Sequence, residues 1–415
     1  KKNIANPTNE HLNLAMEQNA GGIAALENDL LDSLKQSTLK AGVKLSITQS
    51  LTDAKKAVED YITFLKDFKN DSPRSFRLGK DLYAKKFEYD IQSQYTYQQI
   101  YDSAIQRKTF LHNEMYKIAD KLWPKYFGTK AKPADSLALI RMMIDTISVY
   151  HVKPDEFQSA IEKQLPELVK FINEKKLIYI DPSKPLKVRK EPAYMAGVAG
   201  ASISSPGPYD KGGNTYYNVG SLSGWTSERA ESYLREYNHY ILQILNIHEA
   251  IPGHYTQLVY SNNAPSIIKA VFGNGAMIEG WAVYGELMML ENGYGNNEPE
   301  MWLMYYKWNL RTVCNTILDI SVHTMDMTEE QALKLLENEA FQQKAEAQGK
   351  WKRVNVTNVQ LTSYYTGFKE ICDLREDLKK KQGNKFNLKV FHEKFLSYGS
   401  APVKMIRQEM LSEIK

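Results

Sequence analysis

Two histidines and an adjacent glutamate are the residues best suited to chemistry in this sequence. They lie in the segment HEAIPGH, which begins at His248 and Glu249 and ends at His254. Imidazole and carboxylate groups are preferred zinc ligands, and a catalytic zinc site uses three protein ligands and one water. The segment follows the apolar run 241–247, where an ionisable pair would be costly to bury without a partner such as a metal ion. These residue types therefore indicate a metal site.

The spacing of the two histidines requires a break in the helix. Six residues turn an ideal helix by about 600°, which leaves His248 and His254 roughly 120° apart. Pro252 removes a helical hydrogen bond, and Gly253 permits backbone angles that other residues avoid. We therefore expect a distortion that swings His254 back toward His248. The alternative is that both are capping or core histidines around a Pro-Gly turn.

A third ligand is offered by the apolar segment 277–286. Its acids, Glu279 and Glu286, are seven residues apart and share one helical face within roughly 20°. Two acids facing inward suggest one metal ligand and one carboxylate that supports the site. Alternatively, Glu286 is simply exposed near the helix end.

The two motifs together resemble a known family. HEAIPGH at 248–254, followed by Glu279-Gly-Trp-Ala-x-Tyr284, is similar to the bacterial domain of unknown function 885 family. Its members are regarded as zinc peptidase-like proteins, related in fold to helical gluzincins such as Taq carboxypeptidase and thimet oligopeptidase. The resemblance runs from about residue 191 to 402 and is faint before that, and complete members are longer. One departure is Tyr255, where many members have another histidine.

This resemblance implies roles for individual residues. His248, His254 and Glu279 would bind Zn²⁺, and Glu249 would be the general base. The implied fold is mainly α, two-lobed and gluzincin-like, with a small β-sheet beside the active-site cleft. We expect residues 1–180 to form an N-terminal helical lobe, and residues 181–415 to form the small β region and the catalytic helical lobe of one intertwined unit.

A polar stripe follows the expected helix 306–323. Arg311, Asn315, Asp319 and His323 recur at every fourth residue among apolar neighbours, so they should face a polar cavity or a hydrogen-bonded network. Facing the metal, His323 would donate to an oxyanion and Arg311 would hold a substrate carboxylate. The alternative is a structural Arg–Asp network without substrate contact.

Tyrosines supply two further candidates. Tyr364 or Tyr365 would donate to the oxyanion, and the resemblance favours Tyr364. The β-prone runs 201–204 and 214–218 would present an edge strand to an extended peptide, with Tyr216 as a substrate contact. Both runs could equally pair only with each other.

The elements that must position these residues are mostly helices. Apolar spacing with a 3.6-residue period predicts helices over 51–68, 82–110, 137–152 and 157–177. Short β-prone runs punctuated by Pro and Gly occupy 177–221, and helices return from residue 227 onward. The coarse prediction is a helical protein with a small β insertion just before the metal motif.

Composition excludes several classes of function. The chain has 415 residues and a net charge of +4, from 53 basic and 49 acidic residues spread along its length, which gives no case for binding nucleic acid. No run of 18 apolar residues exists that could span a membrane.

Cys314 and Cys372 would form a disulfide only in an oxidising compartment with suitable geometry. We expect an exported protein, periplasmic or lipid-anchored after loss of a signal, rather than a cytoplasmic one; its oligomeric state is not indicated.

The sequence thus predicts a zinc-dependent hydrolase, a metallopeptidase that acts on short peptides in a cleft too deep for folded proteins. An amidase or esterase that acts on another small amide or ester substrate is the alternative within enzymes. A binding protein that keeps the fold without turnover is the alternative outside them.

Overall fold

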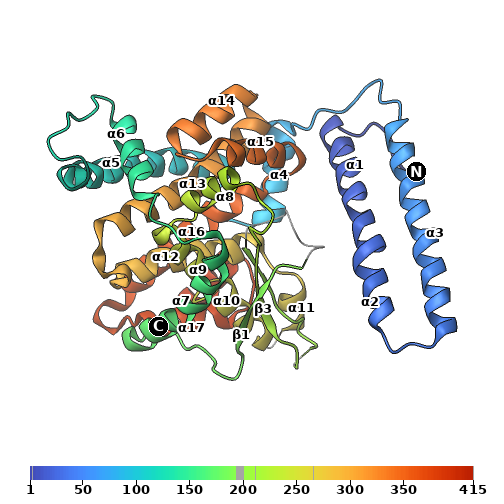
Figure 1. The fold of residues 1–415 in the computed structure, drawn as a ribbon. Coiled ribbons are helices and arrows are strands. Elements are labelled where there is room, and N and C mark those ends of the chain that lie inside the picture. Colours follow the sequence, from blue (N-terminus) through green and yellow to red (C-terminus); the bar gives the residue numbers. More distant parts are fainter. Residues whose placement is uncertain (2, 193–200, 211, 265, 415) are drawn as a thin grey trace.

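The computed structural model describes residues 1, 3–192, 201–210, 212–264 and 266–414, which are mainly helical with one three-stranded sheet (Figure 1). This confirms the predicted fold class. None of the helices in the described part of the chain combines the length and hydropathy that crossing a membrane requires.

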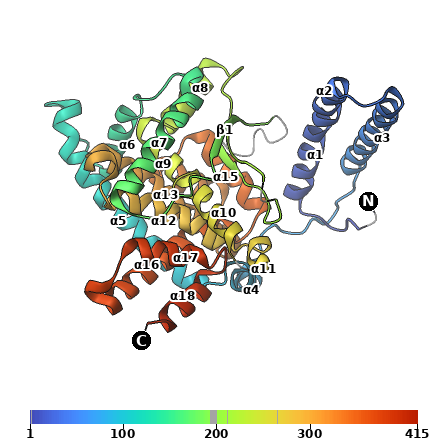
Figure 2. The same ribbon diagram turned by 90° about the horizontal axis from the view of Figure 1, so that it is seen from below.

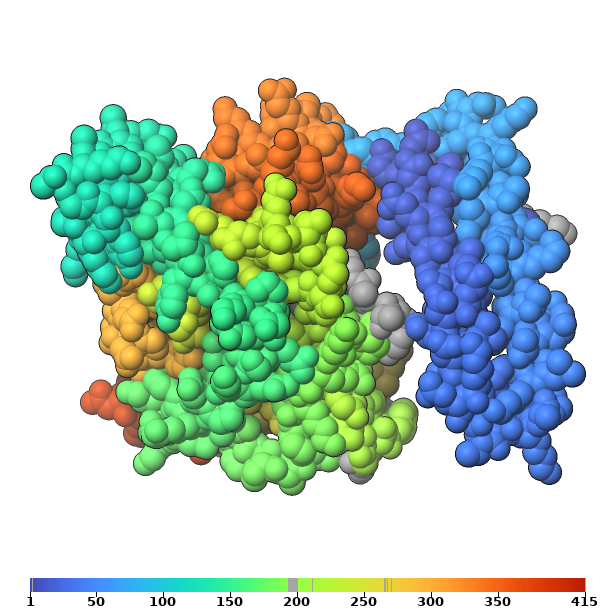
Figure 3. Space-filling model, viewed as in Figure 1, coloured from blue at the N-terminus to red at the C-terminus, as the bar shows by residue number. Residues whose placement is uncertain are grey.

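The N-terminal helices form a hairpin that stands apart from the body of the molecule (Figures 1, 2 and 3). The hairpin consists of α1 (Asn9–Ala24), α2 (Leu30–Gln36) and α3 (Ala41–Lys66). Few of its apolar side chains are buried, so it adds little to the core. The base of the hairpin is tethered where His11 Nε2 lies 3.1 Å from the Val356 carbonyl oxygen and Arg74 donates to the Asn6 carbonyl.

The next helices pack on the body: α4 (Gly79–Ile91), α5 (Tyr97–Phe127), α6 (Ser136–Ile147) and α7 (Phe157–Lys175). The prediction of one helix over 82–110 is wrong, because two helices meet there. Gln92 adopts a left-handed conformation that ends α4, and Thr96 with Gln99 forms a capping box that starts α5. Tyr89 is consequently an exposed residue of α4.

Three strands form a sheet in the order β1 (Leu186–Lys190), β3 (Thr215–Val219), β2 (Ala201–Ser204). β3 pairs in parallel with β1 and antiparallel with β2. The β-prone run at 177–180 does not form a strand. Within the described residues β3 is therefore the central strand, and Tyr217 points from it to donate a hydrogen bond to Asn246 Oδ1 at 2.9 Å.

The remaining helices build the centre of the molecule. They are α8 (Ser227–Glu236), α9 (His239–Glu249), α10 (His254–Asn263), α11 (Ile267–Val271), α12 (Gly275–Glu291), α13 (Pro299–Thr324), α14 (Glu329–Lys334), α15 (Lys344–Val356), α16 (Ser363–Gln382), α17 (Leu388–Ser397) and α18 (Val403–Ser412). α12 and α13 are buried on nearly all sides, which is typical of central helices. Cys314 is buried in α13, and neither Cys314 nor Cys372 forms a disulfide.

The core is shared across the expected boundary at residue 180. Apolar side chains from α4 to α7 pack in the same cluster as those from α9, α12, α13 and α16. The segment that stands apart is instead the α1–α3 hairpin (Figure 3).

The backbones of α12 and α16 approach each other closely where the two helices cross in the core. A methyl group added to Gly280 would lie 2.3 Å from the carbonyl carbon of Gly367, and one added to Gly367 would lie 1.7 Å from the Ala276 oxygen. Only glycine fits at both positions. The crossing matters for function because it brings the turn of α12 that carries Glu279 against the first turns of α16.

Gly280→Ala should therefore lower the free energy of unfolding by about 2 kcal/mol or more, because the backbones must separate to admit a methyl group. Gly349→Ala is the matched control, since nothing lies within 4 Å of the added methyl group. Urea unfolding of both variants measures the difference. Equal stability of Gly280→Ala and the wild type would refute the close crossing.

Candidate metal centre

The HEAIPGH segment is a break between two helices. α9 ends at Glu249 and α10 begins at His254, and the peptide bond between Ile251 and Pro252 is cis. The Gly253 N–H donates to the Ile247 carbonyl at 2.9 Å, so the break remains hydrogen-bonded. A methyl group on Gly253 would lie 1.7 Å from the His248 carbonyl oxygen. The predicted distortion is confirmed, and it depends on a residue without a side chain.

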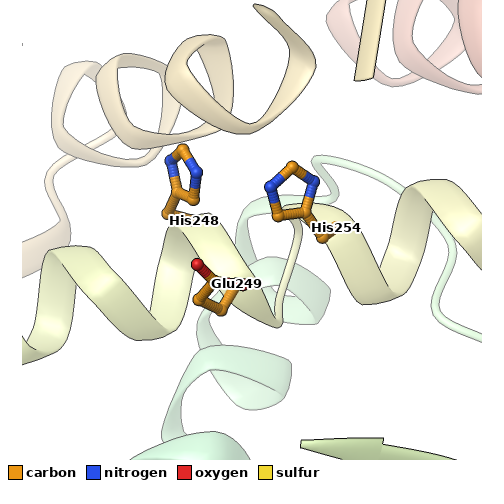
Figure 4. A group of neighbouring side chains, drawn as sticks. All are labelled: His248, Glu249 and His254. Atoms are coloured by element: carbon orange, nitrogen blue, oxygen red, sulfur yellow. The ribbon is translucent and has the colours of Figure 1, made fainter. Parts of the chain in front are cut away.

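The break brings the two histidines together (Figure 4). Their ring centroids are 4.9 Å apart and nearly perpendicular. Glu279 Oε2, from α12, lies 3.7 Å from His248 Nε2 and 3.5 Å from His254 Nε2. The three side chains keep 9%, 15% and 21% of their exposure in the order His248, His254, Glu279, so a small ligand can reach them. The structure therefore gathers all three predicted ligands around one point.

Glu249 borders the same point from the end of α9. Potential ligand atoms of His248, Glu249 and His254 all lie within 4.8 Å of one another. Burial raises the pKa of the Glu249 carboxyl, although His254 and His248 act in the opposite direction. Burial, followed by the charge of Glu249, also raises the pKa of Tyr217 well above its usual value. Glu249 is thus a carboxylate with increased proton affinity beside two imidazoles.

Glu286 supports His248 from behind. Its Oε1 lies 2.7 Å from His248 Nδ1 and accepts a hydrogen bond of 3.0 Å from Trp308 Nε1. The Glu286 side chain is fully buried, so the alternative of an exposed acid at the helix end is wrong. Burial alone would lower the pKa of His248, but the carboxylates of Glu279 and Glu286 raise it to about 10. The pair fixes the ring so that Nε2 faces Glu279.

The polar stripe of α13 is a network directed at α15 and the loop after it. Arg311 Nη2 lies 2.5 Å from Glu346, and Asn315 accepts a hydrogen bond of 2.7 Å from Lys350. Asp319 accepts from the Tyr83 hydroxyl and from the backbone N–H groups of Val359 and Leu361. This geometry favours the structural alternative for the stripe.

His323 and Arg311 are both engaged by protein groups. His323 Nε2 lies 3.0 Å from the Val354 carbonyl oxygen and 2.9 Å from that of Thr357, and the side chain is 2% exposed. Arg311 also stacks over the Trp308 ring at 4.8 Å. The contacts of His323 do not place it with the metal ligands, whereas Arg311 adjoins them through Trp308, which bonds Glu286.

The two candidate tyrosines have different environments. Tyr365 bonds Ser103 on α5 through its hydroxyl. Tyr364 is half-buried, and its hydroxyl lies 3.5 Å from Arg353 Nη2. Burial and then the charge of Glu279 raise the pKa of Tyr364. Of the two tyrosines, Tyr364 is therefore the one whose phenol the charge of Glu279 reaches, whereas the Tyr365 hydroxyl is engaged by α5.

Tyr216 lies on the central strand, not on an edge. The Arg189 guanidinium stacks over the Tyr216 ring at 4.0 Å. The two β-prone runs, now β2 and β3, pair with each other, which was the alternative to peptide binding. β2 remains an edge strand among the described residues.

Residues that sequence analysis did not single out also shape the centre. Trp281 donates through Nε1 to the Pro252 carbonyl at 2.8 Å, and Trp308 holds Glu286. Tyr217 anchors the sheet on α9 two residues before His248, through Asn246. Trp281 lies in the apolar segment 277–286 and Tyr217 in the β-prone run 214–218. Their contacts join separate elements and are seen only in the folded structure.

Comparisons with known proteins identify relatives over the whole chain. A family model described as bacterial protein of unknown function (DUF885) matches residues 1–410, including the region where the motifs gave little signal. A presumed lipoprotein of unknown function from Shewanella oneidensis is 57% identical, with a TM-score of 0.87 over 99% of this chain and 74% of that chain. A presumed lipoprotein from Colwellia psychrerythraea is 19% identical, with a TM-score of 0.78 over 98% and 70%. No curated protein matches. The chain therefore belongs to the bacterial DUF885 family.

Proposed function

We propose that this protein is a zinc-dependent hydrolase that cleaves amide bonds in short peptides. The observation that carries the proposal is the meeting of His248, His254 and Glu279 beside Glu249, from three separate helices. Two imidazoles and one carboxylate are a ligand set of catalytic zinc sites, and the open fourth position accepts water.

The distances between the ligand atoms fit this metal. Zinc ligands at about 2.0–2.1 Å in a tetrahedron lie roughly 3.4 Å from one another. Glu279 Oε2 is 3.5 and 3.7 Å from the two Nε2 atoms, which is longer than a hydrogen bond and close to that value. A metal ion would also compensate the carboxylates buried around His248.

The protein groups then have distinct tasks. Zinc, when bound, lowers the pKa of a water molecule toward neutrality. Glu249 takes a proton from that water and passes it to the leaving amine, a role suited to a carboxyl whose pKa is raised. The Tyr364 hydroxyl donates to the substrate carbonyl oxygen as it gains negative charge. Glu286 keeps His248 in the required orientation.

The runner-up function is hydrolysis of esters or other small amides by the same groups. The binding-only alternative is disfavoured by Glu249, because a site that only binds has no need of a base. We also propose an exported protein, since the Shewanella and Colwellia proteins are described as presumed lipoproteins.

Purified protein reconstituted with zinc should hold about one zinc ion per chain, and should hydrolyse members of a peptide, ester and acylamino substrate panel. Glu249→Gln should retain the metal and lower the rate by a factor of about 100 or more, because the base is removed. Elemental analysis and product release by mass spectrometry measure the two effects. Metal-free protein after reconstitution, or equal rates for wild type and Glu249→Gln, would contradict the proposal.

Glu286→Gln should weaken zinc binding by about 10- to 100-fold, because the neutral amide no longer orients and polarises His248. Competition with a chromophoric chelator measures the affinity. Glu291→Gln is the matched control on the same helix, where the carboxylate pairs with Arg375 at the surface. Equal affinities for the two variants would show that Glu286 does not act on the metal ligand.

A further inference from the structure

Arg353 is a charged group close to the proposed centre that the reaction does not use. It is exposed on α15, and its Nη2 donates to Gln360 Oε1 at 2.7 Å and lies 3.5 Å from the Tyr364 hydroxyl. In the described part of the chain, no acidic side chain forms an ion pair with Arg353. A guanidinium held in place without a carboxylate partner is suited to binding an anion from solution.

The position of Arg353 is fixed by the α13 network. Glu346, Lys350 and Arg353 follow one another on one face of α15, and the first two contact Arg311 and Asn315. The loop that carries Gln360 is held by Asp319 through the Val359 and Leu361 N–H groups. Arg353 and its two partners are therefore presented by anchored backbone on both sides.

Tyr364 connects Arg353 to the metal ligands. A methyl group added to Gly275 would lie 3.7 Å from Ser363 Oγ, and Gly280 faces Gly367, so α12 and α16 run in the same direction with Glu279 near the first turns of α16. Tyr364 is in the first turn of α16, the part of the helix that packs against the turn of α12 carrying Glu279, and its hydroxyl lies 3.5 Å from Arg353 Nη2. A substrate whose carbonyl oxygen accepts from Tyr364 would extend toward Arg353.

We propose that Arg353, held by Gln360, binds the C-terminal carboxylate of a peptide substrate whose reacting carbonyl oxygen accepts from Tyr364. This proposal rests on the proposed function and names its substrate class. The Tyr364 hydroxyl and Arg353 Nη2 are 3.5 Å apart, and each would add one hydrogen bond to the substrate. The reacting carbonyl oxygen and the terminal carboxylate can therefore be at most about 9 Å apart, which corresponds to one or two residues of extended chain. The reaction would accordingly release one or two residues from the C-terminus.

Binding to the zinc-loaded Glu249→Gln protein tests the proposal without turnover. The probe is a degenerate library of N-acetylated tripeptides without acidic residues, prepared once as free acids and once as C-terminal amides. Equilibrium dialysis and mass spectrometry measure which peptides the protein retains. We expect free acids to be retained at least tenfold over amides, because the amide removes the charge that the guanidinium binds.

Adding Arg353→Gln should reduce this ratio to nearly one. Adding Lys352→Gln, which removes the same charge from the neighbouring exposed residue, should leave the ratio unchanged. Thermal melting verifies that both variants are folded. Retention of neither library, equal retention of acids and amides, or a preserved ratio in Arg353→Gln would each overturn the assignment.

The outcome is separable from that of the proposed function. Acid-selective binding by a protein that hydrolyses nothing would retain the Arg353 site and reject the hydrolase. Hydrolysis with no preference for free acids would retain the hydrolase and reject the Arg353 site.

Discussion

The architecture of the centre depends on one close approach of the backbone to itself. Gly253 passes so near the His248 carbonyl that no side chain fits, and this tight break allows two histidines six residues apart to face one carboxylate. An unbroken helix would point them about 120° apart. Trp281 reinforces the break by donating to the Pro252 carbonyl, and Tyr217 ties the sheet to α9 just before it. The surrounding helices therefore serve to hold a short irregular segment.

Two further features of the core position the groups around the break. The glycine crossing of α12 and α16 brings Glu279 and Tyr364 toward each other. The polar stripe of α13 fixes α15 and the loop before α16, which present Arg353, Gln360 and Tyr364. Buried polar groups of this kind cost free energy unless they are paired, and here the pairing orders segments that lack an extensive apolar face. Val359 illustrates the constraint: its φ of +71° is unfavourable for a β-branched residue and is held by Asp319.

The sequence predicted that His248, His254 and Glu279 would meet because the signals are local: two histidines, a Pro-Gly break and a pair of acids one heptad apart. It also predicted the helical class and a small β region, although one of the β-prone runs, 177–180, forms no strand. It did not predict the boundary between α4 and α5, because a 3.6-residue apolar pattern continues across the capping box at Thr96. The direction of the α13 stripe was also undetermined, since periodicity shows that one face is polar but not which element it meets. Trp308 contacts Glu286 on another helix, and Arg353 contacts Gln360 and Tyr364 beyond the end of its own helix, so residue spacing within one helix does not show these contacts.

The central claim is that His248, His254 and Glu279 hold one zinc ion. Diffraction from zinc-soaked crystals of the full chain, recorded on both sides of the zinc absorption edge, tests it most directly. The account predicts a single strong anomalous peak in contact with His248 Nε2, His254 Nε2 and a Glu279 carboxylate oxygen. No peak at this position, or a zinc ion bound elsewhere with these three side chains unmoved, would contradict it.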